Sequence, residues 1–341
     1  MKQADKEYMR QALALAQLAW GRTSPNPMVG AVLVRDGVVI GRGYHHRAGT
    51  PHAEINALAD GSGSSAGATL YVTLEPCSTY GRTPPCTEAI IHAGIARVVI
   101  GCLDPNPHHA GQGVAILRRA GIAVTCPVLE EECAALNEAF FKWITTGMPF
   151  VLLKMAMTLD GRIATVAGDS QWVTGPEARD EVQRLRQWAD AVMVGGETVR
   201  RDHPALTVRR VPDWEVQPRR IVVSRQLTPE AAAALLQPGL FPEVIAPADA
   251  AAWREEMVRL GKSGVTAVLV EGGGELAGTL LQAGMVDKVD FFIAPKILGG
   301  RNSRPVVGGE NPLRLADALA LHRVKMVMAG ADFRITGYLK G

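Results

Sequence analysis

Four residues near the start of the chain have the types and spacing of a hydrolytic metal site. His52 and Glu54 are separated by one residue, and Cys77 and Cys86 follow further along. A catalytic zinc site uses three histidine, cysteine or carboxylate ligands and keeps a fourth position for water. A carboxylate that does not bind the metal can move the protons of that water. We therefore interpret His52, Cys77 and Cys86 as metal ligands and Glu54 as the catalytic acid and base.

The residues around this set indicate how it is positioned. The histidine and glutamate lie at the start of an expected helix, and Cys77 follows an apolar strand. Two prolines place Cys86 in the first turn of another helix, where the helix dipole favours a thiolate, the form that binds metal. Two alternatives stay open: a structural zinc site, which normally has four protein ligands, or two buried cysteines and a surface histidine. His45 and His46 could face the site from the second strand, but for both we expect a surface role.

The composition excludes several classes of protein. The chain has 341 residues, of which 47% are hydrophobic and 21% are charged, with a formal net charge of +2. This near-neutral balance gives no reason to expect a nucleic acid or a membrane as a partner, and no apolar run reaches the roughly 18 residues of a membrane span. The amino terminus lacks the apolar core of a signal peptide, and the five cysteines suit a reducing compartment. We expect a cytoplasmic protein that acts on small molecules.

The pattern of apolar residues predicts two α/β domains, 1–147 and 148–341. In the first, we expect strands at 29–34, 38–44, 69–74 and 97–101, with a hairpin turn at Asp36 and Gly37, and helices at 5–20, 53–60, 85–94, 111–120 and 129–145. In the second, we expect strands at 150–154, 190–194, 220–224, 243–246, 265–270, 288–294 and 322–328, and helices at 176–188, 228–237, 249–260 and 274–283.

One glycine-rich turn in the second domain could hold a phosphate. Residues 267–278 read AVLVEGGGELAG, which indicates a strand, a turn and a helix start. Backbone N–H groups at a helix start can bind phosphate, and Gly272, Gly274 and Ala277 have the G-x-G-x-x-A spacing of a dinucleotide site. The turn lies late in its domain, which weakens this interpretation. The alternative is a tight connection that needs glycine for steric reasons.

These motifs together resemble one family. The zinc residues are similar to the H-x-E…P-C-x-x-C signature of the cytidine deaminase superfamily, but the second cysteine follows after nine positions instead of three. That spacing, in residues 73–86 (TLEPCSTYGRTPPC), resembles the riboflavin-pathway pyrimidine deaminases of the RibD family, as do residues 24–32 (SPNPMVGAV). The reductase half of the same family is similar to residues 154–164 (KMAMTLDGRIA), 168–174 (GDSQWVT) and 198–209 (TVRRDHPALTVR).

The resemblance implies a fold and two activities. The fold is a cytidine-deaminase-like three-layer domain followed by a dihydrofolate-reductase-like α/β domain. The first activity is the zinc-dependent hydrolytic deamination of 2,5-diamino-6-(5-phosphoribosylamino)pyrimidin-4(3H)-one. The second is the NADPH-dependent reduction of 5-amino-6-(5-phosphoribosylamino)uracil to the ribitylamino product. Reductase domains of this kind commonly pair, so a homodimer is implied as well.

The resemblance also assigns binding residues. The residues implied to hold NADPH are Ala156, Trp172, Thr198, Asp202, Ser224, Gly273, Gly274, Glu275, Leu276, Ala277 and Gly278. The residues implied to hold substrate are Asn26, Ser170, Arg186, Leu206, Arg209 and Glu271. A guanidinium suits a sugar phosphate, although an exposed arginine is more often a solvated charge. Asn26 could equally be a turn residue between prolines. Lys154 is expected near the reacting sugar, without a role in proton transfer.

Two other functions fit parts of the pattern. One is a nucleoside, nucleotide or tRNA deaminase with an unrelated appended domain, against which the cysteine spacing and the near-neutral charge both count. The other is a zinc-binding module that acts through protein contacts. Glu54 argues against this second function, because a structural zinc site has no use for a spare carboxylate.

Overall fold

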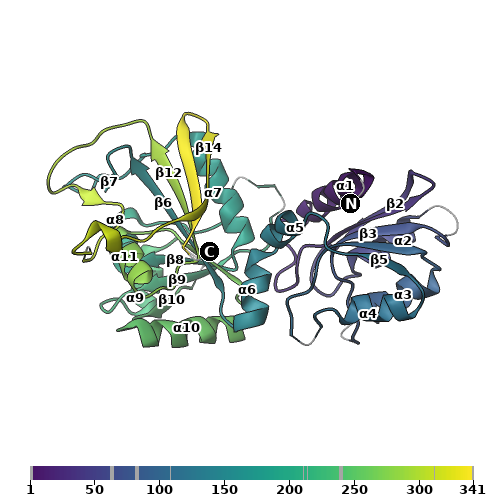
Figure 1. Cartoon of the computed structure of the whole chain (residues 1–341). Helices are drawn as coiled ribbons and strands as arrows, with labels where there is room; N and C mark the ends of the chain where they lie inside the picture. Colours follow the sequence, from purple (N-terminus) through teal and green to yellow (C-terminus); the bar gives the residue numbers. More distant parts are fainter. Residues whose placement is uncertain are drawn as a thin grey trace. The chain divides into compact units, whose positions relative to one another are not determined.

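A computed structural model describes residues 3–61, 65–80, 84–107, 109–209, 211–212, 214–237, 241–310 and 312–339. Residues 81–83, which belong to the cysteine motif, lie outside the described residues. The contacts within the chain divide it into two units, Met1–Gly147 and Met148–Gly341 (Figure 1). Within the described residues, no helix has both the length and the apolar character needed to cross a membrane.

The first unit is built on a five-stranded sheet with the order β2-β1-β3-β4-β5. Its strands are β1 (Gly30–Arg35), β2 (Val38–Tyr44), β3 (Thr69–Leu74), β4 (Arg97–Cys102) and β5 (Ala123–Thr125). Its helices are α1 (Gln3–Gln17), α2 (Ala53–Asp60), α3 (Cys86–His92), α4 (Gln112–Arg119), α5 (Glu130–Leu136) and α6 (Glu138–Thr146). β1 pairs antiparallel with β2 and β3, whereas β3, β4 and β5 are parallel.

Helices cover both faces of this first sheet. Successive side chains of a strand point to opposite faces, so each buried strand supplies two cores. Leu33 and Leu70 pack in the core that contains residues of α2, α3 and α4. Val32 and Tyr71, their neighbours in sequence, pack in the core that contains residues of α1 and α5. The result is a three-layer α/β/α unit.

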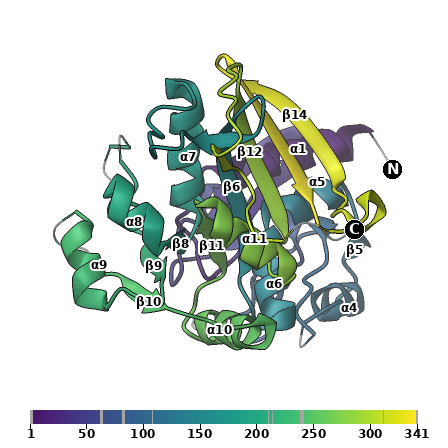
Figure 2. The same cartoon turned by 90° about the vertical axis from the view of Figure 1, so that its left-hand side faces the viewer.

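The second unit is built on an eight-stranded sheet with the order β10-β9-β8-β11-β6-β12-β15-β14 (Figure 2). Its strands are β6 (Phe150–Thr158), β8 (Ala191–Gly195), β9 (Arg219–Val223), β10 (Glu243–Ile245), β11 (Ala267–Val270), β12 (Lys288–Ala294), β14 (His322–Ala329) and β15 (Asp332–Tyr338), and β7 (Arg162–Ala164) pairs with β13 (Arg304–Pro305). Its helices are α7 (Pro176–Trp188), α8 (Gly196–Asp202), α9 (Pro229–Leu235), α10 (Ala250–Lys262), α11 (Gly274–Gln282) and the 3-10 helix η1 (Leu315–Asp317).

Most strands of this second sheet are parallel, but the two strands at one end are antiparallel to their neighbours. The strands from β10 to β12 run parallel, whereas β15 and β14 are antiparallel to their neighbours. On one face, Val151, Leu153 and Met155 of β6 pack in a core with residues of α10 and α11. The carboxyl ends of parallel strands meet at one edge of a sheet, which is where ligands bind in open α/β folds.

The structure agrees with most predicted elements and corrects others. The hairpin turn is confirmed, because Asp36 and Gly37 both have positive φ, at 51° and 78°. The single helix expected at 129–145 is wrong. It is two helices, α5 and α6, separated at Asn137, whose side-chain amide binds the backbone N–H and C=O of Met28. The strands β5, β7, β13 and β15 and the helix α8 had not been expected from the sequence.

One close approach between β2 and α2 sets the position of the helix that follows His52. A methyl group at Gly43 would lie 2.3 Å from the backbone nitrogen of Ala57 and 2.4 Å from the carbonyl oxygen of Ala53. Both are backbone atoms of α2, so α2 would have to move away from the sheet. The small size of Gly43 therefore holds the start of α2 close to β2.

We expect Gly43→Ala to lower the free energy of unfolding by about 1–3 kcal/mol, because overpacking forces the backbone to shift. Val38→Ala is the control, since Val38 lies on the same strand with 62% of its surface exposed and should change stability by less than about 0.5 kcal/mol. Urea unfolding measures both variants. Equal stabilities for the two variants would contradict the close approach.

Candidate functional site

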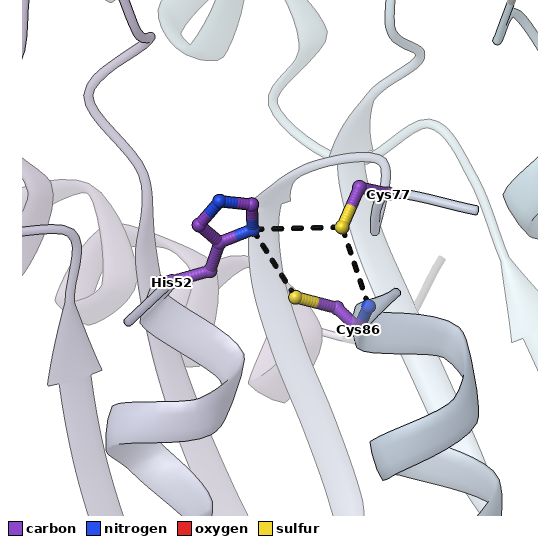
Figure 3. Close-up of side chains that lie close together, drawn as sticks. All are labelled: His52, Cys77 and Cys86. Carbon is purple, nitrogen blue, oxygen red and sulfur yellow. Dashed lines mark hydrogen bonds between the residues drawn. The ribbon is translucent and has the colours of Figure 1, made fainter. Parts of the chain in front are cut away.

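The structure brings the three predicted metal ligands together (Figure 3). His52 immediately precedes α2, Cys77 lies just beyond the end of β3, and Cys86 is the first residue of α3. The Nδ1 atom of His52 lies 3.5 Å from the sulfur of Cys77 and 3.3 Å from the sulfur of Cys86. The three ligand atoms all lie within 4.8 Å of one another.

These distances fit a zinc ion. With Zn–S bonds of about 2.3 Å and Zn–N bonds of about 2.0 Å, a tetrahedral site separates nitrogen and sulfur by roughly 3.5 Å. One ring nitrogen carries at most one hydrogen, so it cannot make a well-directed hydrogen bond to each of two sulfurs. A cation shared by the three atoms accounts for the arrangement. The donor set, one imidazole and two thiols, is one that zinc prefers.

The local charges favour metal binding. Hydrogen bonds with Cys86 and His52 hold the pKa of the Cys77 thiol well below its ordinary value, against the opposing effect of burial. The backbone N–H of Cys86, at the start of α3, also donates to the Cys77 sulfur at 3.2 Å. Cys77 is therefore held as a thiolate, the form that binds metal.

Glu54 lies beside these ligands, in the first turn of α2. Its side chain is buried, and burial together with the nearby Cys77 charge raises the pKa of its carboxyl to about 7. A group with a pKa near neutrality can both accept and donate a proton at physiological pH. The position and the pKa of Glu54 suit acid–base catalysis.

The expected surface role of His45 is wrong. Its side chain is buried, and its ring lies edge-on to the ring of His52, with centroids 5.3 Å apart. The Nδ1 of His45 lies 3.1 Å from the carbonyl oxygen of Pro51, so it donates, and Nε2 then accepts from the side-chain amide of Asn26 at 3.1 Å. Asn26 is thereby placed next to the metal ligands. His46 is exposed, as expected, and stacks on Tyr44.

Glu75 is a site residue that the sequence interpretation missed. It lies two positions before Cys77 and is buried, and its carboxylate accepts hydrogen bonds from the backbone N–H groups of Asp104, Gly111 and Val114 at 3.0–3.2 Å. It therefore ties the segment after β4 to the Cys77 segment. A charged residue directly after an apolar strand was the only signal for it in the sequence.

In the second unit, most residues expected to hold NADPH lie at the carboxyl ends of parallel strands. Thr198 and Asp202 belong to α8, which follows β8, and Ser224 follows β9. The turn at 273–278 follows β11, and Ala156 lies in the second half of β6. A methyl group at Gly273 would lie 3.5 Å from the hydroxyl of Thr198, so the two helix starts are adjacent.

Steric constraints explain why several positions of this turn are glycine. Gly272 has a φ of 99°, which favours glycine. A methyl group at Gly274 would lie 2.6 Å from the carbonyl oxygen of Pro305, and one at Gly278 would lie 2.2 Å from that of Gly308. These glycines allow close packing of α11 against residues 305–309. A methyl group at Gly273 would make no contact closer than 3.5 Å, so steric need does not explain glycine at this position.

Two of the residues expected to hold substrate bind each other. Arg186 donates from Nε and Nη2 to the two carboxylate oxygens of Glu271, at 2.6 and 2.9 Å, and both side chains are buried. Burial would raise the pKa of the Glu271 carboxyl, but Arg186 and the charge of Lys154 hold it below its ordinary value. Glu271 is therefore a fixed negative charge at the end of β11.

The other residues expected to contact NADPH or substrate do not form one cluster in the way that Arg186 and Glu271 do. The hydroxyl of Ser170 donates to Asp202 at 3.3 Å, which joins an expected substrate contact to an expected NADPH contact. Trp172 is 64% exposed and stacks with Arg179, at 4.7 Å from its ring centre. Leu206 is almost fully buried, so its side chain offers little surface to a ligand. Arg209 is exposed, and its backbone N–H donates to Gln183.

Comparison with known proteins accounts for both units. The family model of the cytidine and deoxycytidylate deaminase zinc-binding region matches residues 2–102, and that of the RibD C-terminal domain matches residues 149–333. The riboflavin biosynthesis protein RibD of Aquifex aeolicus is 42% identical, with 98% of each chain covered. The chain belongs to the RibD family. The RibD of Synechocystis is 43% identical over 99% of this chain and 97% of its own.

Solved structures of RibD proteins have the same fold. A RibD of Acinetobacter baumannii superposes with a TM-score of 0.87 at 37% identity, and 98% of each chain is covered. The crystal structure of a diaminohydroxyphosphoribosylaminopyrimidine deaminase/5-amino-6-(5-phosphoribosylamino)uracil reductase from Thermotoga maritima gives a TM-score of 0.87 at 35% identity, with the same coverage. The predicted fold class, a deaminase-like unit followed by a reductase unit, is confirmed.

Membership of the RibD family decides between the functions considered above. The chain is a bifunctional enzyme of riboflavin biosynthesis, with a zinc-dependent deaminase and an NADPH-dependent reductase. The second half is matched by the RibD C-terminal domain, so it is not an unrelated appended domain. The zinc-binding module without enzymatic activity is excluded by the same matches.

Proposed function

We propose that residues 1–147 deaminate 2,5-diamino-6-(5-phosphoribosylamino)pyrimidin-4(3H)-one and that residues 148–341 reduce the resulting 5-amino-6-(5-phosphoribosylamino)uracil in the cytoplasm. The observation that carries the proposal is the approach of His52, Cys77 and Cys86 beside the buried carboxyl of Glu54. The cysteines in the described residues are all free, which supports a reducing compartment. The RibD relatives, which match along nearly their whole length, support the choice of substrates.

In the deaminase, His52, Cys77 and Cys86 hold the zinc ion and Glu54 moves the protons. Zinc, when bound, supplies the Lewis acidity that makes water nucleophilic near neutral pH. Glu54 accepts a proton from the attacking water and gives it to the amino nitrogen, which leaves as ammonia, while the oxygen of the water remains on the pyrimidine. Asn26, whose amide is oriented by His45, binds the pyrimidine.

In the reductase, the carboxyl ends of the parallel strands bind NADPH and the sugar phosphate. NADPH, when bound, supplies the hydride that reduces C1′ of the ribose. The residues that hold it are Ala156, Trp172, Thr198, Asp202, Ser224 and those of the turn at 273–278. The residues that hold the substrate are Ser170, Arg186, Leu206, Arg209 and Glu271. Arg186 fixes Glu271 by its two hydrogen bonds, so this carboxylate is oriented before the substrate binds.

We also propose that two copies of the chain pair through β14, the edge strand of the second sheet. An edge strand presents unpaired backbone groups that another strand can bind. The side chains of Val324, Met326 and Met328 are each more than half exposed on β14. Apolar patches of this kind mark interfaces. A second copy is the partner that fits, because two identical edge strands can pair about a two-fold axis.

We expect Glu54→Gln to lower kcat for ammonia release by at least about 100-fold while zinc stays bound, because the amide cannot carry the proton. Zinc content and ammonia release from the pathway pyrimidine measure the two effects. Glu88→Gln, at an exposed position of α3, is the matched control and should behave as the wild type. NADPH oxidation with the deaminated pyrimidine should be unchanged in both variants.

Two results would contradict this assignment. The first is full ammonia release by the zinc-loaded Glu54→Gln variant. The second is a wild-type preference for cytidine or deoxycytidylate over the pathway pyrimidine, measured side by side.

We expect the wild-type chain to have twice the mass of one chain by light scattering, and Met326→Lys to have the mass of one chain. A charge placed in an apolar interface is desolvated without a partner, which opposes association. Val38→Lys is the control, because Val38 is similarly exposed on β2 of the other unit. A Met326→Lys variant that remains dimeric would rule out β14 as the interface.

A further inference from the structure

Four neighbouring strands of the second sheet carry charged residues of alternating sign. Val270 of β11 pairs with Leu153, so Glu271 and Lys154 are the next positions along, and Lys154 pairs directly with Asp290 of β12. Asp290 pairs with Thr336 of β15. Arg334 lies two positions before Thr336 on the same strand, so the side chains of Asp290 and Arg334 point to the same face of the sheet. We call Glu271, Lys154, Asp290 and Arg334 the charged belt.

Helix α7 binds both ends of the charged belt. At one end, Arg186 makes its two hydrogen bonds to Glu271. At the other end, Nη1 of Arg334 donates to Glu181 at 2.9 Å. The inner carboxylate, Asp290, accepts from Nε and Nη2 of Arg334 at 2.9 and 2.6 Å and is almost fully buried. Each carboxylate of the belt is therefore paired with an arginine.

Lys154 differs from the other members. Within the part of the chain that the structure describes, its ammonium makes no hydrogen bond and no ion pair, and it lies 5.9 Å from the centre of the Phe292 ring. The lysine is partly buried between two carboxylates whose oxygens already bind arginines. Its three N–H donors are thus available to a ligand. Ala156, an expected NADPH contact, lies two positions further along β6, on the same face.

We propose that Asp290, fixed by Arg334, is a positioning residue of the reductase, whose negative charge keeps the Lys154 ammonium protonated and in place beside Glu271. The proposal rests on the reductase function proposed above, because it places the substrate at Glu271. Asp290 itself lies inside the sheet pairing and is bound by Arg334, so it acts through Lys154 and not by touching the substrate.

The electrostatics support this role. Burial lowers the pKa of Lys154 and the positive charge of Arg186 lowers it further, whereas the charges of Glu271 and Asp290 raise it. The remaining charged groups around Asp290 are Arg334 of the belt, which binds Asp290 from β15, and Glu181 of α7, which binds Arg334. Removing the charge of Asp290 takes away one of the two effects that keep Lys154 protonated. The pKa of Lys154 must then fall.

The test is the pH dependence of NADPH oxidation by the full chain with the deaminated pyrimidine as substrate. In the wild type, we expect kcat to fall at alkaline pH as Lys154 loses its proton. In Asp290→Asn, this alkaline limb should move to lower pH, because Asp290 is one of the two carboxylates whose charges raise the pKa of Lys154. The KM for NADPH should change little, because Asp290 does not contact the cofactor.

Two further variants separate positioning from stability. Asp332→Asn is the structural control: Asp332 is a buried aspartate of β15 whose carboxylate accepts from the N–H of Gly175, at the start of α7. It should lower the unfolding temperature and leave the alkaline limb unchanged. Glu181→Gln removes the carboxylate of α7 that binds Arg334 from outside the belt, at a more exposed position. Its alkaline limb should move in the same direction as that of Asp290→Asn, by less.

Three outcomes would overturn the inference: an alkaline limb in Asp290→Asn at the wild-type pH, an equal shift in Asp332→Asn, or a wild-type kcat with no alkaline limb. If Asp290→Asn does not fold, the Glu181→Gln variant decides, and an unmoved limb there overturns the inference. Failure of the wild type to oxidise NADPH with this substrate would instead contradict the proposed reductase function.

Discussion

The deaminase unit depends on the approach of one imidazole nitrogen to two sulfur atoms, at 3.5 and 3.3 Å. The three atoms come from a helix start, a strand end and a second helix start, so every element of the surrounding sheet must be placed correctly. Gly43 lets α2 approach β2, and Glu75 ties the neighbouring segment to Cys77. Burial of Glu54 among these groups raises its pKa to about 7, so the same packing that assembles the ligands also prepares the acid and base.

The reductase unit is also an α/β structure, but its buried charged residues are arranged differently. We propose that its anionic ligands bind at the carboxyl ends of the parallel strands, where helix starts follow the strands. Here the buried charges are paired in advance: Arg186 holds Glu271, and Arg334 holds Asp290. Lys154 lies between these pairs without an ion pair among the described residues. Buried charges that are fixed by partners cost no reorganisation when substrate binds, which is the advantage of a preorganised site.

The sequence was enough to predict that His52, Cys77 and Cys86 come together near Glu54, and it predicted most elements, because these depend on local patterns and on a motif with unusual spacing. It was not enough for His45, whose burial depends on the pairing of β2 with β1. Neither Glu75 nor Asp290 could be recognised either, since their partners are far away in the sequence and are brought near only by the sheet register. The break at Asn137 was missed for the same reason, because it follows from a contact with Met28.

The central claim is that His52, Cys77 and Cys86 form a zinc site with one position left for water. X-ray absorption at the zinc edge of the purified full chain tests it most directly. The account predicts about one zinc per chain, with two sulfur neighbours at about 2.3 Å and two nitrogen or oxygen neighbours at about 2.0 Å. A zinc shell with three or four sulfurs, or a chain that does not retain zinc, would contradict it.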